Sequence, residues 1–499
     1  MTEPGMSKFE HQRRDKRLRM TELGADPYGG RFEGAEAAAA VKTRYVDNQE
    51  GQRACCAGRI VLLRDIGKLI FITLRDSSGT IQLGLSQKLL SEQWELVKLL
   101  ELGDLIGAAG QLGKTKTGEI TIWTESVTML SKALLPPPEK FHGLADVDLR
   151  YRQRYVDLWA NPEVMERFQA RSAMVASIRE FLRKRGFFEV ETPMMQTIAG
   201  GAAARPFITH HNTLDMDLYL RIAPELFLKR LLVGGMEKVF EINRNFRNEG
   251  LSTRHNPEFT MMELYQAYGD YHVMMELTES LIGHLIEMHC PGTVLPFGEV
   301  EINYSRPWRR ARYADLLKEY AGCDIDDLAA VRAKAQALEL HESDMDDAVV
   351  INEVFEATVE ENLIHPTFVM DYPAVLCPLT RPSKADPRYA ERFELFIGTM
   401  ELANAYTELN DPDIQDANFR RQLRGEHAEE TMAKMDADFI TALKYGMPPA
   451  GGLGIGIDRL IMLLTNATSI RDVILFPLLK PASAARQAEP ASEDSESRS

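Results

Sequence analysis

The amino-acid sequence predicts an α+β chain in which a small closed β-barrel precedes a larger domain of mixed helices and strands. Three observations support this fold class. Short apolar runs with β-branched residues, separated by turn residues, fill positions 57–130. Three consecutive prolines then follow at 136–138, and beyond them long helical segments alternate with strand-like runs. A chain of 499 residues is long enough for two or three such domains.

Composition and charge exclude several classes of protein. Apolar residues make up 44% and charged residues 26%, an ordinary globular balance. The net charge is -16, but the acidic excess lies in the later part of the chain. Residues 1–150 hold 21 basic and 20 acidic side chains, whereas the remainder holds 37 basic and 54 acidic ones. A polyanionic partner is therefore still compatible with the first part of the chain. The sequence lacks an eighteen-residue apolar stretch, and its five cysteines have no metal-binding or redox spacing. We therefore expect a cytoplasmic protein with reduced thiols and no membrane segment.

The N-terminal part is predicted to form a helical arm at 1–52 and a barrel at 53–135. The arm contains a basic amphipathic segment over 8–24, for which a solvated helix without a partner is an equally good interpretation. The barrel strands are expected at 60–62, 70–74, 81–83, 120–123 and 127–129, with a helix over 89–102 after the third. Five strands with a helix in this position are typical of oligonucleotide-binding barrels, the OB-fold.

The rest of the chain divides into a connector, a large domain and a tail. The connector covers 136–150, where the prolines favour a stiff extended conformation. The large domain covers 151–482, begins with a long helix over 163–185, and is expected to carry a mostly helical insertion at about 266–390. The segment 483–499 is rich in Ala, Ser and Glu, and we expect a disordered acidic tail.

The strongest chemical signal in the large domain is a strand, loop and returning strand over 239–265. Neither a Walker sequence nor a dinucleotide-binding fingerprint is present, so a nucleotide must be bound in another way. Because side chains alternate along a strand, one face of the returning strand carries Phe259, Glu263 and Tyr265. The matching face of the first strand carries Asn243, Asn245 and Arg247. A guanidinium, an aromatic ring and a carboxylate are thus expected to converge.

This block resembles motif 2 of the class II aminoacyl-tRNA synthetases, and within them it is most similar to the lysyl-tRNA synthetases. Three further segments agree: 186–193 resembles the dimer-forming motif 1, 220–225 the amino-acid-binding loop, and 452–459 motif 3. The resemblance runs from about residue 10 to 480. It implies an OB-fold anticodon-binding domain followed by a class II catalytic domain, an antiparallel sheet flanked by helices. It also implies ATP, L-lysine and tRNA(Lys) as substrates and a homodimer. A Gly-rich stretch such as 452–459, taken alone, is more often merely a strand packed tightly against a helix.

The chemistry of amino-acid activation explains why the sequence shows no nucleophile-base arrangement. A carboxylate that attacks the α-phosphate of ATP is already ionised at neutral pH, so the step needs cations and alignment in place of a general base. The resemblance assigns the catalytic roles to Arg247 and Arg459. The ATP-binding residues that it implies are Arg247, Glu249, His255, Asn256, Phe259 and Arg459.

Magnesium is the expected cofactor, because side chains alone do not balance the charge of a bent triphosphate. The ligands implied by the resemblance are Glu394 and Glu401. Seven residues apart, they cannot face the same way on one unbroken strand, so we expect a turn at Gly398-Thr399 between two strands. Without the resemblance, an acidic pair like this is more often a solvated face.

Specificity for lysine requires acidic groups deep in the pocket, because a buried ammonium needs a partner. The lysine-binding residues implied by the resemblance are Gly201, Glu225, Arg247, Glu263, Tyr265, Asn404, Tyr406 and Glu408. Where related lysine enzymes commonly have two glycines, this chain has Ala403 and Ala405, whose methyl groups are expected to narrow the pocket floor.

The barrel is expected to bind the anticodon. Phe71 is expected to stack on a base, Gln82 to read a base edge, and Glu125 to accept from the imino groups of uridines. Core packing is the alternative for Phe71. Two other functions fit parts of the sequence: a relative that attaches lysine-like groups to a translation factor, which would resemble the catalytic part alone, and a non-catalytic nucleic-acid-binding descendant, which would be expected to lack Arg247, Glu394 or Arg459.

Overall fold

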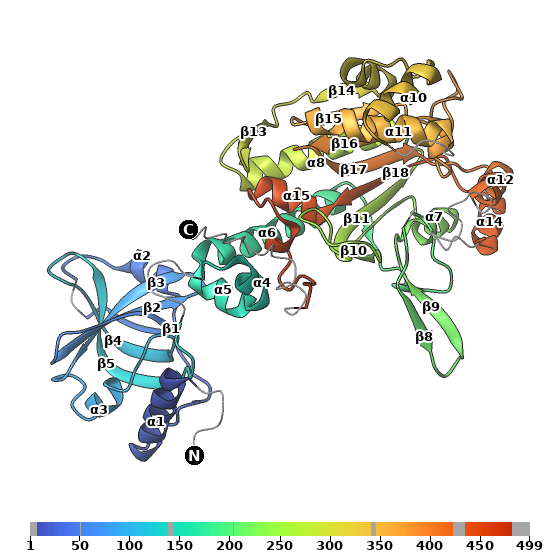
Figure 1. Ribbon diagram of the computed structural model, residues 1–499. Coiled ribbons are helices and arrows are strands. Elements are labelled where there is room, and N and C mark those ends of the chain that lie inside the picture. The colour runs from blue at the N-terminus through green and yellow to red at the C-terminus, as the bar shows by residue number, and fades with distance from the viewer. Residues whose placement is uncertain are drawn as a thin grey trace, which may run out of the picture. The chain divides into compact units, whose positions relative to one another are not determined.

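The computed structural model describes residues 7–49, 51–137, 144–202, 204–340, 346–422 and 435–481. The chain forms two units, residues 1–145 and 146–499 (Figure 1). The division falls inside the segment predicted as a connector, of which 138–143 lie outside the described residues. The predicted acidic tail at 483–499 lies outside them as well.

The N-terminal unit is a closed five-stranded barrel with the strand order β1-β2-β3-β5-β4. Its elements are α1 (Lys8–Glu22), α2 (Ala38–Arg44), β1 (Arg53–Asp65), β2 (Leu69–Asp76), β3 (Gly79–Ser86), α3 (Trp94–Val97), β4 (Leu105–Lys114) and β5 (Ile120–Ser131). The predicted arm helix and the OB-type barrel are both confirmed.

Two assignments within the barrel were wrong. The runs at 120–123 and 127–129 belong to one strand, β5, and the missing strand is β4. The helix expected over 89–102 is reduced to α3, Trp94–Val97. Strand β4 is rich in Gly and Ala because its neighbours approach closely: a Cβ on Gly110 would lie 2.1 Å from the Trp123 carbonyl oxygen, and one on Gly107 2.3 Å from the Phe32 ring.

The second unit is built on an eight-stranded sheet with the order β14-β15-β16-β17-β18-β11-β10-β6. Its strands are β6 (Phe188–Glu189), β10 (Lys238–Phe246), β11 (Glu258–Ala267), β14 (Arg309–Arg312), β15 (Thr367–Met370), β16 (Arg392–Ile397), β17 (Met400–Thr407) and β18 (Ala450–Gly456). All neighbours are antiparallel except the two edge pairs, β6 with β10 and β14 with β15. The sheet flanked by helices is the expected architecture.

The two faces of this sheet differ in chemistry. On β11, Met262 and Leu264 face a core that includes side chains from α8 (Tyr271–His289) and α15 (Ile457–Leu464). Glu263 and Tyr265 alternate with them and so point to the opposite face, which α7 (Glu225–Val233) borders. The polar face of the central strands is therefore available for a site.

The segment 266–390 differs from the mostly helical insertion that the sequence suggested. It does contain α8, α9 (Tyr313–Leu316), α10 (Leu328–Ala337) and α11 (Asp347–Thr358), but it also supplies β14 and β15 of the main sheet. Strands of four residues between helices carry too little periodicity to be found from the sequence.

Smaller elements complete the second unit. The remaining elements are α4 (Val147–Arg152), α5 (Arg154–Ala160), α6 (Pro162–Lys184), α12 (Pro412–Gln422), α14 (Ala437–Lys444), a three-stranded sheet of β7 (Met195–Gln196), β9 (Met216–Leu220) and β8 (Ile208–His211), and a hairpin of β12 (Val294–Phe297) and β13 (Val300–Asn303). Within the described ranges, the longest apolar helices fall short of what crossing a membrane requires.

Candidate active site

The floor of the site is formed by β18, whose glycines lie between β11 and β17. Gly454 pairs with Glu263 on one side and with Asn404 on the other. Gly452 pairs with Tyr265, and a Cβ there would lie 1.9 Å from Glu408 Oε1 and 2.7 Å from the Tyr265 ring. Side chains from both neighbouring strands thus occupy the space above the face of β18 on which Gly452 and Gly454 lie, while Leu453 and Ile455 point into the core on the other face. Close packing against a helix, the alternative for this Gly-rich run, does not account for these contacts.

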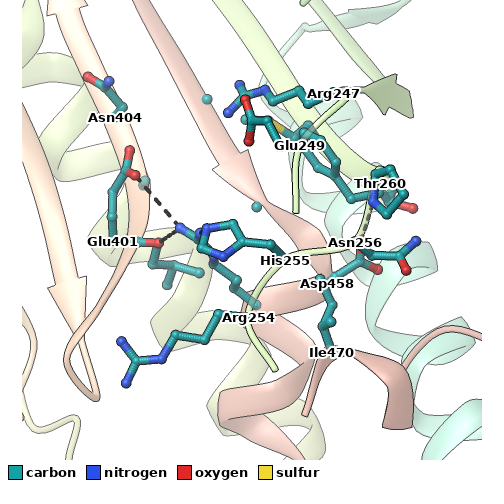
Figure 2. A pocket seen from close by; sticks show the side chains of 18 of the residues that line it. Arg247, Glu249, Arg254, His255, Asn256, Thr260, Glu401, Asn404, Asp458 and Ile470 are labelled. Atoms are coloured by element: carbon teal, nitrogen blue, oxygen red, sulfur yellow. Dashed lines mark hydrogen bonds and ion pairs between the residues drawn. The ribbon is translucent and has the colours of Figure 1, made fainter. Parts of the chain in front are cut away.

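A cavity of about 200 Å³ opens above one end of this floor. It is lined by residues from the β10–β11 loop and from β11, β17, β18 and α15, among them Arg247, Glu249, His255, Asn256, Phe259, Glu401, Asn404 and Arg459. In Figure 2, Arg247 and Glu249 lie on one side of the cavity, and Glu401 and Asn404, which are on β17, lie on the other. All six residues predicted to bind ATP thus border one cavity.

The guanidinium of Arg247 lies over the ring of Phe259, with 5.2 Å from Cζ to the ring centroid. Arg247 follows directly after β10, and its backbone N–H donates to the Pro257 carbonyl at 2.9 Å, which holds the loop against β11. Its buried Nε has no hydrogen-bond partner among the described residues. Arg247 thus places a positive charge at the wall of the cavity, as an anionic ligand requires.

His255 and Arg459 are joined on the other side of the cavity. Arg459 Nη2 lies 3.0 Å from His255 Nε2 and, being a donor only, requires that nitrogen to accept. The ring proton is therefore on Nδ1 and is donated to Ser252 Oγ at 2.9 Å. Burial and the positive charge of Arg459 lower the pKa of His255, so the ring is neutral at pH 7. Arg459 is the cation of this pair, and its Nη1 also donates to the Glu401 carbonyl oxygen at 2.6 Å.

The predicted metal ligands lie on adjacent strands joined by the expected turn. β16 and β17 form a hairpin through Gly398 and Thr399, which have φ angles of +60° and +61°. Glu394 accepts from Tyr372 Oη at 2.7 Å and is paired with Arg392, while Glu401 is 43% exposed toward the cavity. Burial raises the pKa of Glu394; Arg392 opposes this rise and the Glu401 carboxylate adds to it.

This carboxylate pair is compatible with a magnesium ion held partly by a ligand. No group of three or more His, Cys, Asp or Glu side chains within the described ranges is arranged to hold a metal ion alone. Two carboxylates that disfavour each other's charge, next to a cavity, suit a hard cation that takes its other oxygens from phosphate and water.

A cluster of buried ionisable groups lies next to this cavity. Glu225, Glu263 and Glu408 are 4%, 7% and 1% exposed. Tyr406 Oη donates to Glu225 Oε1 at 2.7 Å, and Tyr265 Oη donates to Glu263 Oε2 at 3.3 Å. The structure thus brings together five of the side chains predicted to bind lysine. Deep burial of three carboxylates at one place excludes a merely solvated acidic surface.

The remaining lysine-binding predictions border this cluster. Asn404 lies between it and the nucleotide cavity. Gly201 has a φ of +87°, and a Cβ there would lie 3.0 Å from Glu225 Cβ, so the loop can pass this close to Glu225 only with glycine. The expectation for Ala403 and Ala405 was wrong in part: both are buried in the hydrophobic core, and Ala405 lies on the strand face opposite to Tyr406.

On the barrel, two of the three predicted anticodon-binding residues lie on neighbouring strands of the outer surface. Phe71 is half-buried on β2, and Gln82 on β3 accepts from Thr121 Oγ1 at 2.7 Å. Trp123, which the sequence analysis did not select, contacts Phe71 edge-on at 6.2 Å. Glu125 is on β5 and is paired with Arg53. Since Ile70 and Ile72 fill the barrel core, Phe71 points outward.

Two further site residues were not identified from the sequence. Lys229 on α7 lies between Glu225 and Glu408. Arg392 contacts Glu394 and donates to Asn404 Oδ1 at 3.1 Å, which connects the predicted metal ligand to the amino-acid pocket. For Lys229 a signal existed, because it stands four residues after Glu225, the spacing of an ion pair on one helix face.

Comparison with known proteins agrees with this geometry. Residues 146–480 match the family model of class II tRNA synthetases for D, K and N, and residues 54–130 match that of the OB-fold nucleic acid binding domain. Curated lysine–tRNA ligases are similar over almost the whole chain. That of Pelotomaculum thermopropionicum is 53% identical over 96% of both chains. Those of Carboxydothermus hydrogenoformans and Syntrophomonas wolfei are 54% and 51% identical over 94% and 97% of this chain and 97% and 99% of theirs. With its barrel, its glycine-floored sheet and its buried carboxylates, the chain belongs to the lysine–tRNA ligase family of class II aminoacyl-tRNA synthetases.

Proposed function

We propose that this protein activates L-lysine with ATP to lysyl-adenylate and transfers the lysyl group to the 3′ end of tRNA(Lys). The observation that carries this proposal is the set of three buried carboxylates directly beside a cavity lined by Arg247, Phe259 and Arg459. The first feature suits a substrate with two ammonium groups, and the second suits a nucleoside triphosphate.

In the first step, a lysine carboxylate oxygen bonds to the α-phosphorus of ATP, and the bond to the bridging oxygen breaks to release pyrophosphate. Arg247 is positioned to bind both the attacking carboxylate and the α-phosphate, which reduces the repulsion between two anions. Phe259 offers a flat surface to adenine, and Arg459 supplies positive charge at the opposite end of the cavity. His255, neutral and held by Arg459, serves as a hydrogen-bonding group toward the outer phosphates.

Magnesium belongs to this proposal as the cofactor. Glu394 and Glu401 would hold it, with Arg392 and Tyr372 fixing the Glu394 carboxylate. When bound, the ion supplies positive charge that bends the triphosphate and stabilises pyrophosphate as it leaves.

In the second step, a terminal ribose hydroxyl of the tRNA attacks the lysyl carbonyl carbon and gives up its proton. The bond between this carbon and the bridging oxygen breaks, and AMP leaves with that oxygen. The barrel's task is to bind anticodon bases through its outer surface, where Phe71 and Trp123 offer stacking faces and Gln82 a hydrogen-bonding edge. The presence of the barrel argues against a relative restricted to the catalytic part. The presence of Arg247, Glu394 and Arg459 argues against a non-catalytic descendant.

We further propose a homodimer that acts in the cytoplasm. The motif 1 strand β6 lies at the edge of the main sheet, and its Phe188 is 64% exposed, which suits an interface between two copies. All five cysteines are free thiols, as a reducing compartment requires. Sedimentation equilibrium tests the dimer, and a monomer at micromolar concentration would refute it.

One assay tests the central activity. Exchange of labelled pyrophosphate into ATP is measured with each of the twenty amino acids in turn, with and without magnesium. We expect exchange with lysine alone and only in the presence of magnesium. Exchange with another amino acid in preference to lysine would overturn the proposed substrate.

A further inference from the structure

Lys229 is a lysine side chain inside a pocket proposed to bind lysine. Its ammonium lies 2.6 Å from Glu225 Oε1, contacts Glu408 Oε2, and is 5.4 Å from the centroid of the Tyr406 ring. The residue is 0% exposed. Burial disfavours the ammonium, but the carboxylates of Glu225 and Glu408 outweigh burial and raise the pKa of Lys229, so the side chain is charged at neutral pH.

The charges buried around Lys229 do not balance. Glu225, Glu263 and Glu408 supply three carboxylates, and Lys229 is the one cation that forms an ion pair with any of them among the described residues. Behind them, Arg221 and Glu241 form a closed pair at 2.6 Å and cancel each other. Arg247, which also acts on Glu263, is matched by the carboxylate of the amino-acid substrate. The pocket therefore lacks two positive charges, which is a charge deficit of two.

Two observations indicate that protons on Glu263 and Glu408 take the place of the missing positive charges when the pocket is empty. Glu408 Oε1 is buried and has no hydrogen-bond partner in the described part of the chain, and Glu263 accepts only a long hydrogen bond from Tyr265. Burial and the neighbouring carboxylates raise the pKa of Glu263 and that of Glu408 to about 8, although Arg221 opposes the rise at Glu263 and Lys229 opposes it at Glu408. An empty pocket at pH 7 thus holds close to two protons, and a substrate with two ammonium groups can replace both.

We propose that Lys229 is a specificity-determining residue that sets the charge deficit of the pocket at two, so that an amino acid with an ammonium at each end is favoured over one with a neutral side chain. This inference rests on the proposed function and deepens it. Lys229 acts through Glu225 and Glu408 and takes no part in bond formation. Without its charge the deficit would be three, which lysine cannot fill.

A charge-balance experiment tests the proposal. Pyrophosphate exchange is measured with lysine and with norleucine, which has the same number of side-chain carbons but no side-chain ammonium, for four proteins: the unchanged chain, Glu408→Gln, Lys229→Met, and the double variant. Glu408→Gln leaves a deficit of one and should reduce the preference for lysine over norleucine at least tenfold. Adding Lys229→Met restores a deficit of two. The double variant should therefore prefer lysine over norleucine at least fivefold more strongly than Glu408→Gln does.

A purely structural role predicts the opposite for the double variant. If Lys229 only supports packing, removing it on top of Glu408→Gln will weaken lysine activation further without restoring the preference, and the proposal is overturned. Lys132→Met is the matched control, because Lys132 is also buried between two carboxylates, Glu101 and Asp104, but in the barrel. It should lower the melting temperature and leave the lysine preference unchanged.

A measurement on the unchanged protein keeps the inference testable if the variants do not fold. Calorimetric titrations with lysine at pH 7 in buffers of different ionisation enthalpy give the number of protons released on binding. We expect close to two for lysine and about one fewer for norleucine. Release of none or of three by lysine would contradict the balance attributed to Lys229. Absence of lysine-dependent exchange by the unchanged protein, by contrast, would refute the proposed function itself.

Discussion

At the scale of single residues, the acidic pocket makes lysine binding depend on pH. The raised pKa values of Glu263 and Glu408, about 8 each, mean that both carboxyls are largely protonated at pH 6.5 and ionise as the pH rises through 8. Only the ionised forms attract the substrate's ammonium groups, which stay charged in this range. The KM for lysine in pyrophosphate exchange should therefore rise roughly tenfold or more between pH 8 and pH 6.5. The KM for ATP, measured in the same series, should change much less, and a flat profile for lysine would show that these carboxyls do not bind it.

Arg247 is the residue to which the proposed first step assigns the most direct role. If its cation binds both the carboxylate and the α-phosphate, as proposed, replacement by Ala should lower lysine-dependent exchange about 100-fold or more. Arg244→Ala is the control, since that side chain lies on β10, the strand that precedes Arg247, is 37% exposed, and only approaches Glu258 at 3.7 Å. Near-normal exchange by Arg247→Ala would show that Arg247 does not have this role.

The sequence revealed the acidic side chains of the pocket but not the cation among them. Glu225, Glu263 and Glu408 could be assigned because the resemblance to the lysyl-tRNA synthetases implies them. Lys229 was missed although its spacing from Glu225 allows an ion pair, because a lysine on a helix usually lies in water. Its burial depends on where α7 packs against the sheet, and that is a property of the tertiary structure.

At the scale of elements, the hairpin and the barrel show which strands can be read from a sequence. The turn at Gly398-Thr399 was predictable because two carboxylates with one function had to face the same way. Strand β4 was not predictable, since its glycines and alanines are selected by close contact with neighbours such as Trp123 and not by strand propensity. Local patterns therefore located the elements with regular burial and missed those shaped by packing.

The glycine strand β18 yields a prediction of its own. In Gly452→Ala the added methyl would meet Glu408 Oε1 at 1.9 Å and the Tyr265 ring at 2.7 Å, both on the lysine side of the site. Such overpacking typically costs about 1–3 kcal/mol. We expect at least a tenfold loss of lysine activation and a lower melting temperature, while ATP binding measured by calorimetry is retained. Gly292→Ala, where a methyl would meet nothing within 4 Å, should behave as the unchanged protein. Equal activity of the two variants would contradict the conclusion that the site has no room for a methyl group at Gly452.

At the scale of the whole molecule, the proposed function assigns tRNA binding to the barrel and lysine activation to the second unit. A single substitution can separate these two contributions. Phe71→Ala removes an outward ring from the barrel while leaving the sheet of the second unit untouched. Because stacking of a base on an aromatic side chain is worth about 1–3 kcal/mol, the KM for tRNA in lysine charging should rise about 5- to 100-fold. Pyrophosphate exchange needs no tRNA and should be unchanged.

Leu89→Ala, which removes another exposed apolar side chain of the barrel, is expected to leave both activities intact. Unaltered charging by Phe71→Ala would exclude this ring from tRNA binding, whereas a parallel loss of exchange would mean that the second unit depends on the barrel for its own activity.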